Sequence, residues 1–84
     1  MIFNHQMEGG VEMTNSKKLR ELIKNKGFKL KFIAEKLGLS AYGFQMKVEN
    51  RSEFKTGEIA ILCKLLNINS LKEKEEIFFA IKDD

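Results

Sequence analysis

The sequence predicts a compact all-α domain of five helices, and three observations support this fold class. The chain of 84 residues contains no proline, and 43% of its residues are hydrophobic. Apolar residues recur at intervals of three and four in several segments, which is typical of helices that bury one face. Glycine, serine or threonine stands at the ends of these segments, where helices start and stop. A chain this short forms one domain with a small core.

The first helix is expected over residues 17–26. Its apolar stripe is formed by Leu19, Leu22 and Ile23. Ser16 is the expected cap and Gly27 the expected stop, because small polar residues start helices and glycine ends them. Phe28 follows as a core residue.

Residues 30–48 have the pattern of two short amphipathic helices joined by a tight turn. The apolar stripes of the two helices are formed by Ile33, Ala34 and Leu37 and by Phe44 and Val48. In the turn, Gly38 suits the left-handed end of a helix, Leu39 can turn inward, and Ser40 can accept a hydrogen bond from the next helix. This pattern indicates a helix-turn-helix, and the alternative is an ordinary helical hairpin that arises from packing alone.

Two further helices complete the expected fold. A polar loop over residues 50–55, anchored by Phe54, precedes a helix over residues 57–66 that Thr56 caps. The buried stripe of this helix is formed by Ile59, Leu62, Cys63 and Leu66. Cys63 is therefore expected to be a buried small hydrophobe rather than a nucleophile. Ser70 and Glu73 form an S-x-x-E capping box for the last helix.

The last helix leads into an apolar group formed by Ile77, Phe78, Phe79 and Ile81. Three consecutive apolar residues cannot all face the core from one helix, so we expect at least one of them to contact a partner subunit. These four residues are the expected dimer surface.

Residues 1–13 differ from the rest of the chain. They show no periodicity, contain two adjacent glycines, and have methionines at positions 1, 7 and 13. We expect a disordered leader here and a helix-turn-helix domain over residues 14–84. One hypothesis is that translation starts at Met13, because the codons for residues 8–13 could form a purine-rich stretch that resembles a bacterial ribosome-binding site. The alternative is that residues 1–13 are a genuine flexible arm.

Basic charge concentrates around the predicted helix-turn-helix. Residues 14–55 contain eleven Lys and Arg against four Glu, a net charge of +7, whereas residues 1–13 and 56–84 each carry −2. A polyanion is the natural partner for such a region, since neutralised phosphates release counterions. The alternative is that the lysines only solvate helix faces.

Several other classes of protein are disfavoured. The apolar runs are far shorter than the roughly 20 residues of a membrane span, and the first residues lack the pattern of a secretory signal. A single cysteine suits a reducing cytoplasm. We expect no enzyme, cofactor, metal or small-molecule substrate, because the one histidine is His5 and no catalytic, metal-binding or phosphate-loop motif is present. The acidic residues after Ser70 are most simply a solvated face.

Four segments in register carry a resemblance to a known family. LRELIKNKG resembles its first helix, IAEKLGLS its second helix and turn, KVENRSEF the end of its recognition helix with the following loop, and KEKEEIFFA the tail of small prophage-encoded regulators. Over residues 19–79, the chain is similar to the phage-repressor-type helix-turn-helix family, also called Cro/C1 or XRE. The resemblance implies a five-helix domain of the lambda-repressor-like DNA-binding type.

The resemblance also implies a binding site for double-stranded DNA, with a recognition helix over residues 41–49 in the major groove. Base contacts are implied for Ala41, Tyr42, Gln45 and Met46. Gln45 is suited to direct readout because a carboxamide pairs with adenine N6 and N7. Phosphate contacts are implied for Lys29, Lys31, Ser40, Lys47, Asn50, Arg51 and Lys55.

Four residues depart from the pattern of the family. Lys29 stands where Thr or Ser is common, and Leu30 stands where Gln is common. Phe32 stands where a buried Glu is common, and Gly43 lies within the implied recognition helix. A glycine there costs about 1 kcal/mol relative to alanine.

The expected function is a cytoplasmic, sequence-specific transcriptional regulator that binds a DNA operator. Repression is favoured because the chain leaves no room for an effector or self-cleavage domain. A homodimer would read half-sites one helical turn apart, about 34 Å. The alternative is a protein-binding module, an antitoxin or anti-repressor of a mobile element, with the acidic second half and apolar tail as its contact surface.

Overall fold

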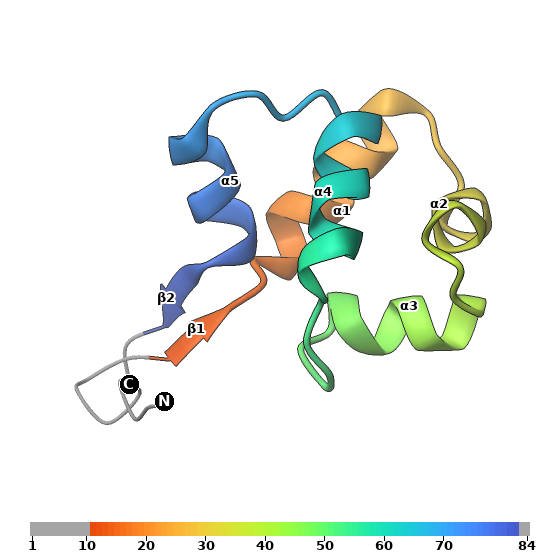
Figure 1. The fold of residues 1–84 in the computed structure, drawn as a ribbon, viewed down its shortest axis with the longest axis horizontal. Helices are drawn as coiled ribbons and strands as arrows, with labels where there is room; N and C mark the ends of the chain where they lie inside the picture. Colours follow the sequence, from red (N-terminus) through yellow and green to blue (C-terminus); the bar gives the residue numbers. More distant parts are fainter. Residues whose placement is uncertain (1–10, 83–84) are drawn as a thin grey trace.

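The computed structural model describes residues 11–82, and five helices and two short strands make up this part of the chain (Figure 1). The elements in order are β1 (Val11–Met13), α1 (Ser16–Lys26), α2 (Leu30–Leu37), α3 (Ala41–Val48), α4 (Thr56–Leu65), α5 (Leu71–Phe78) and β2 (Ala80–Lys82). The mostly helical class and the five expected helices are confirmed. The expectation of an entirely helical fold needs one correction, since β1 and β2 pair.

The helix ends follow local chemistry. Gly27 and Gly38 both adopt left-handed backbone geometry, with φ of 78° and 73°, and end α1 and α2. Ser70 caps α5 by accepting a hydrogen bond from the amide of Glu73 at 3.0 Å, as expected.

Two predicted caps are wrong. The side chain of Asn15, rather than that of Ser16, accepts from the amide of Lys18 at 3.1 Å at the start of α1. Thr56 is already the first residue of α4, and there the Glu58 carboxylate accepts from the amide of Lys55 at 2.9 Å. In both cases the error is of one position, which is within the usual uncertainty of helix boundaries.

All five helices contribute to one core. The fully buried side chains include Leu19, Ile33, Phe44, Leu62 and Ile77. The half-buried Phe54, from the loop between α3 and α4, packs edge-on against Phe44 and Phe78 at ring-centroid distances of 6.0 and 5.9 Å. The loop is therefore anchored in the core by an aromatic side chain, as expected.

The strands form a two-stranded antiparallel ladder in which Met13 pairs with Ala80 and Glu12 with Ile81. Next to this ladder, the amide of Asn15 donates a hydrogen bond to the carbonyl of Ile77 in α5 at 2.6 Å. Residues 11–13 of the expected leader thus form β1 in the structure, whereas residues 1–10 lie outside the described part. A three-residue strand with a distant partner has too little pattern of its own to be recognised in the sequence.

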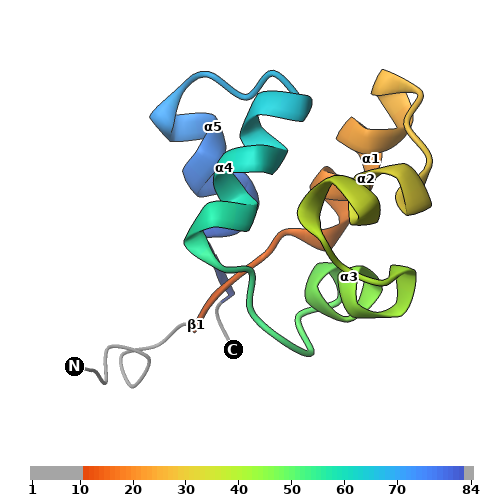
Figure 2. The ribbon, with the colours of Figure 1, turned by 45° about the vertical axis from the view of Figure 1, so that its right-hand side comes forward.

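In both ribbon views α3 lies along one edge of the molecule, below α2 and α4 (Figures 1 and 2). This position leaves one side of α3 uncovered by any other helix or strand of the described residues.

No helix in residues 11–82 combines the length and apolar character needed to cross a membrane.

Candidate nucleic-acid interface

The turn between α2 and α3 has the geometry that its sequence predicts. The amide of Leu39 donates to the carbonyl of Ala34 at 2.9 Å, and the Ser40 hydroxyl accepts from the amide of Gly43 at 2.9 Å. Ala34 is 1% exposed, so its small side chain is buried in the core. Leu39 turns inward and packs against the core. The turn therefore joins α2 and α3 through a short connection held by hydrogen bonds and core packing.

Gly43 has a local explanation. A Cβ atom at this position would lie 3.2 Å from the Ser40 hydroxyl oxygen, which is the atom that caps α3. A larger residue would therefore crowd the cap.

One side of α3 is buried and the other faces solvent. Phe44 and Val48 are each 1% exposed, whereas Tyr42 is 71% exposed. We define the outer face of α3 as Ala41, Tyr42, Gln45, Met46 and Glu49. Of the four expected base-contact residues, Ala41, Tyr42 and Gln45 are exposed and Met46 is half-buried. The structure thus brings all four to the accessible side of the helix.

Glu49 is a prominent residue of the outer face that sequence reasoning missed. Its carboxylate accepts from the carboxamide Nε2 of Gln45 at 3.0 Å and from Nη2 of Arg20 at 3.4 Å. Nε of Arg51 lies 3.7 Å from the other carboxylate oxygen. The Gln45 contact has the i, i+4 spacing that a sequence reveals, but Arg20 comes from α1 and only the tertiary fold brings it here.

Four of the expected phosphate-binding side chains lie at the surface. Lys29, Lys31, Arg51 and Lys55 are all exposed. Lys29 and Lys31 lie at the start of α2, and Arg51 and Lys55 lie in the loop that follows α3. Ser40 is also exposed, although its hydroxyl already accepts the capping hydrogen bond.

Lys47 does not fit its expected role as a phosphate contact. Its Nζ lies 2.6 Å from Oε1 of Glu58, and the two side chains are only 11% and 12% exposed. Burial raises the pKa of Glu58, but hydrogen bonds from Lys47 and from the backbone of Lys55 outweigh it, so the pKa is lowered overall. Lys47 is therefore an internal tie between α3 and α4, which helical spacing alone does not reveal.

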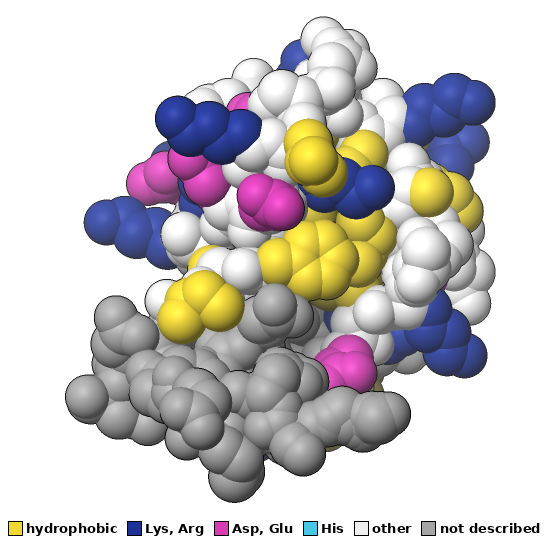
Figure 3. All heavy atoms as spheres, turned by 60° about the vertical axis from the view of Figure 1, so that its left-hand side comes forward, with side chains coloured by type: hydrophobic (Ala, Val, Ile, Leu, Met, Phe, Trp, Pro, Cys, Tyr) yellow, Lys and Arg dark blue, Asp and Glu magenta, His cyan; other side chains and the backbone are white. Residues whose placement is uncertain are grey.

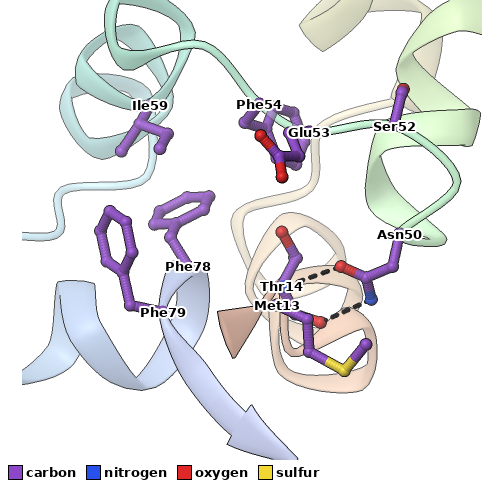
Figure 4. Close-up of a pocket in the computed structure, with 9 residues that line it drawn as sticks. All are labelled: Met13, Thr14, Asn50, Ser52, Glu53, Phe54, Ile59, Phe78 and Phe79. Carbon is purple, nitrogen blue, oxygen red and sulfur yellow. Dashed lines mark hydrogen bonds between the residues drawn. The ribbon is translucent and has the colours of Figure 1, made fainter. Parts of the chain in front are cut away.

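The exposed Asn50 likewise uses its side chain for hydrogen bonds within the protein, to the backbone of Thr14. Its Oδ1 accepts from the amide of Thr14 and its Nδ2 donates to the carbonyl of Thr14, both at 2.8 Å (Figure 4). Asn50 has a φ of 65°, in the left-handed region that Asn tolerates better than most residues. The residue thus ends α3 and holds the segment after β1 against it.

A cavity lies beside this connection. Phe78 and Phe79 lie on one side of it, and Thr14 and Asn50 on the other (Figure 4). Its remaining lining comes from Met13, Ser52, Glu53, Phe54 and Ile59. The cavity thus lies between Phe78 and Phe79 and the hydrogen bonds that join Thr14 to Asn50.

Two of the four residues of the expected dimer surface are buried in the domain and two are exposed. Ile77 is 0% and Phe78 is 5% exposed, so both belong to the core. Phe79 and Ile81 are 40% and 59% exposed, and they line a groove together with Leu71, which is 70% exposed. Hydrophobic side chains gather in a patch on the α5 side, with charged residues around it (Figure 3). We call the group of Ala60, Leu71, Phe79 and Ile81 the α4–α5 apolar surface.

Of the departures at the start of α2, Phe32 has partners at the surface. Phe32 is 37% exposed and stacks on Phe28 with a centroid distance of 5.2 Å. Nζ of Lys36 lies 5.3 Å from the centre of the Phe32 ring. Phe32 is therefore held at the surface, and Leu30 beside it is 39% exposed.

Among residues 11–82, no cluster of three or more His, Cys, Asp or Glu side chains is placed to hold a metal ion. Burial raises the pKa of the half-buried Cys63, which keeps this thiol protonated. A scan against protein-family models finds no match to the sequence, and searches of curated proteins and of solved structures find none either.

Proposed function

We propose that this protein is a sequence-specific, double-stranded DNA-binding transcriptional regulator of the phage-repressor type. One observation carries the proposal: α3 follows a tight capped turn, buries Phe44 and Val48 behind it, and leaves Tyr42 and Gln45 exposed at the edge of the domain. A helix supported in this way fits the major groove, which is wide enough to admit it.

The outer face of α3 supplies chemistry suited to base edges. The Gln45 carboxamide offers one donor and one acceptor to adenine N7 and N6. Ala41 and Met46 offer apolar contacts to a thymine methyl group. Tyr42 adds a ring for the same contact and a hydroxyl for a phosphate.

Exposed cations on either side of α3 supply the affinity that does not depend on sequence. Lys29 and Lys31 precede the turn, and Arg51 and Lys55 follow α3. Arg20 joins this set because it reaches Glu49 on the outer face. Lys47 and Asn50 contribute by fixing the position of α3 rather than by contacting phosphate.

Within this proposal the protein acts as a cytoplasmic homodimer that occupies a two-fold operator and represses by blocking polymerase. The α4–α5 apolar surface is the region that a second copy would cover. Lys74 and Glu75, adjacent in sequence, line the same groove as these apolar residues and offer opposite charges to a symmetry-related copy. Such a self-complementary contact is what a two-fold dimer requires.

The proposal is tested by selection from a random duplex library, followed by affinity measurements at several salt concentrations. We expect a palindromic motif and a slope of about −0.9 in log K against log salt for each phosphate contact. The variant Lys31→Ala/Arg51→Ala/Lys55→Ala should weaken binding to all duplexes and reduce the slope. Lys24→Ala/Lys64→Ala/Lys72→Ala removes the same charge from exposed positions on α1, α4 and α5 and should retain most of the slope.

A protein-binding role, as an antitoxin or anti-repressor of a mobile element, is the second candidate. The α4–α5 apolar surface favours it, because Leu71 is 70% exposed and Ile81 is 59% exposed, and apolar patches mark interaction sites. Two results together would support this role instead. The selection would enrich no duplex, and a stable complex with a protein partner would survive the Lys31, Arg51 and Lys55 substitutions.

A further inference from the structure

The carboxylate of Glu49 brings together three donors from three parts of the chain. Gln45 comes from α3, Arg20 from α1, and Arg51 from the loop that follows α3. The Glu49 side chain is 35% exposed, so the group lies at the surface. A single acidic residue thus contacts the expected base reader and two arginines.

The two arginines illustrate why this arrangement matters for binding. An arginine that already faces a carboxylate must exchange that partner for a phosphate before it contributes to DNA affinity. The uncompensated carboxylate would then lie close to a polyanion, where like charges repel. Glu49 therefore opposes a complex that relies on phosphate contacts alone.

The contact to Gln45 has a second effect, on orientation. The Nε2 group has two protons, and one of them is engaged by Glu49. Turning the amide over would place its oxygen against the carboxylate, so only one orientation is favourable. The second proton and the carbonyl oxygen remain for a base edge, which is the pair that adenine requires.

We propose that Glu49 is a specificity-determining residue of the DNA site, one that positions Gln45 and penalises binding to unselected sequence. This inference rests on the proposed function. Glu49 acts through Gln45, Arg20 and Arg51 and is a positioning residue rather than a base contact.

The test compares Glu49→Gln with Glu35→Gln, a matched control that removes the same charge from an exposed position on α2. Glu49→Gln should bind a random duplex about tenfold more tightly, because a like-charge contact is removed. Its preference for the selected motif over random duplex should fall by a factor of about 5 to 150, the discrimination that one bidentate base contact provides. Glu35→Gln should leave that preference unchanged.

A second readout needs no DNA. In nitrogen-15 NMR spectra of the free protein, the Nε2 proton of Gln45 that faces Glu49 should exchange slowly with water, and its chemical shift and exchange rate should change in Glu49→Gln but not in Glu35→Gln. Circular dichroism should show that both variants stay folded.

The outcomes separate the inference from the proposed function. If the wild type selects a motif and Glu49→Gln keeps both its preference and the Gln45 signals, the inference is overturned while the function stands. If the wild type selects no motif, the function fails and the role of Glu49 in specificity fails with it.

Discussion

The ammonium group of Lys47 lies 2.6 Å from Oε1 of Glu58, and both side chains are almost completely withdrawn from solvent. The same oxygen of Glu58 accepts the amide of Lys55 at 2.9 Å. One carboxylate therefore joins the last turn of α3 to the beginning of α4. Within residues 11–82 no other ion pair links these two helices, so this pair adds to the burial of Phe44 and Val48 in positioning α3.

Replacing Lys47 with methionine should lower the free energy of unfolding by about 3 kcal/mol, since it leaves a nearly buried carboxylate without its partner. Urea denaturation measures the loss. Lys64→Met, at an exposed position on α4, should change stability by less than about 0.5 kcal/mol. In a double-mutant cycle, Glu58→Gln should lower the free energy of unfolding much less in the Lys47→Met background than in the wild type. Additive losses would show that the two side chains are not coupled.

Stability should fall in acid through Glu58. The pKa of Glu58 is lowered in the folded protein from its usual value of 4.5. The ionised carboxylate therefore stabilises the fold above pH 4.5, and this stabilisation is lost as the pH falls through the pKa of the folded protein. The stability difference between wild type and Glu58→Gln should therefore shrink as the pH is lowered below about 4.5. Denaturation curves from pH 7 to 2.5 measure this, and a difference that stays constant over the range would contradict it.

A salt control separates this effect from that of Glu76. A hydrogen bond from Lys18 lowers the pKa of Glu76 as well, but this pair is exposed at the surface. One molar salt should remove the pH dependence due to Glu76 and retain most of that due to Glu58, because buried pairs are screened less.

Asn50→Gly should destabilise the protein by about 2 kcal/mol, the value of two hydrogen bonds, while glycine accepts the backbone conformation without strain. Asn67→Gly is the matched control, since Asn67 also has a positive φ, of 58°, and its side chain bonds only to Asn69. Hydrogen exchange should show faster exchange of the Thr14 amide in Asn50→Gly alone. Equal protection in both variants would mean that the Thr14 to Asn50 connection does not hold in solution.

Self-association should depend on the exposed part of the apolar group at the end of α5. Phe79→Ser/Ile81→Ser should shift sedimentation at micromolar concentration from dimer to monomer and leave the circular dichroism spectrum unchanged. Ile77→Ser should instead unfold the domain, because Ile77 is 0% exposed and serine would leave a buried polar group and a cavity. A wild type that stays monomeric with DNA present would contradict the dimer.

The five helices were predictable because each carries its signal in adjacent residues. The stripe of Ile33, Ala34 and Leu37 and the turn at Gly38 and Ser40 are local patterns, and the structure confirms the helices and turn that they indicate. Exposure on α3 was predictable for the same reason, since burial of Phe44 and Val48 determines which residues face outward.

The parts that escaped prediction depend on residues far apart in the sequence. Lys47 looks like any surface lysine until α4 places Glu58 beside it. Asn50 looks like a loop residue until β1 brings Thr14 within reach. The β1–β2 ladder and the contact of Arg20 with Glu49 also escaped prediction, because each joins segments that are distant in the sequence. Long-range pairing of this kind leaves no periodicity to detect.

The ladder also dictates an order of assembly. Met13 pairs with Ala80, so almost the whole described chain must be in place before β1 finds its partner. Contacts that close long loops form late, whereas the α2–α3 unit is built from neighbouring residues. On the ribosome, the α2–α3 unit can therefore fold long before β2 has been synthesised, and the ladder closes only after α5 has emerged.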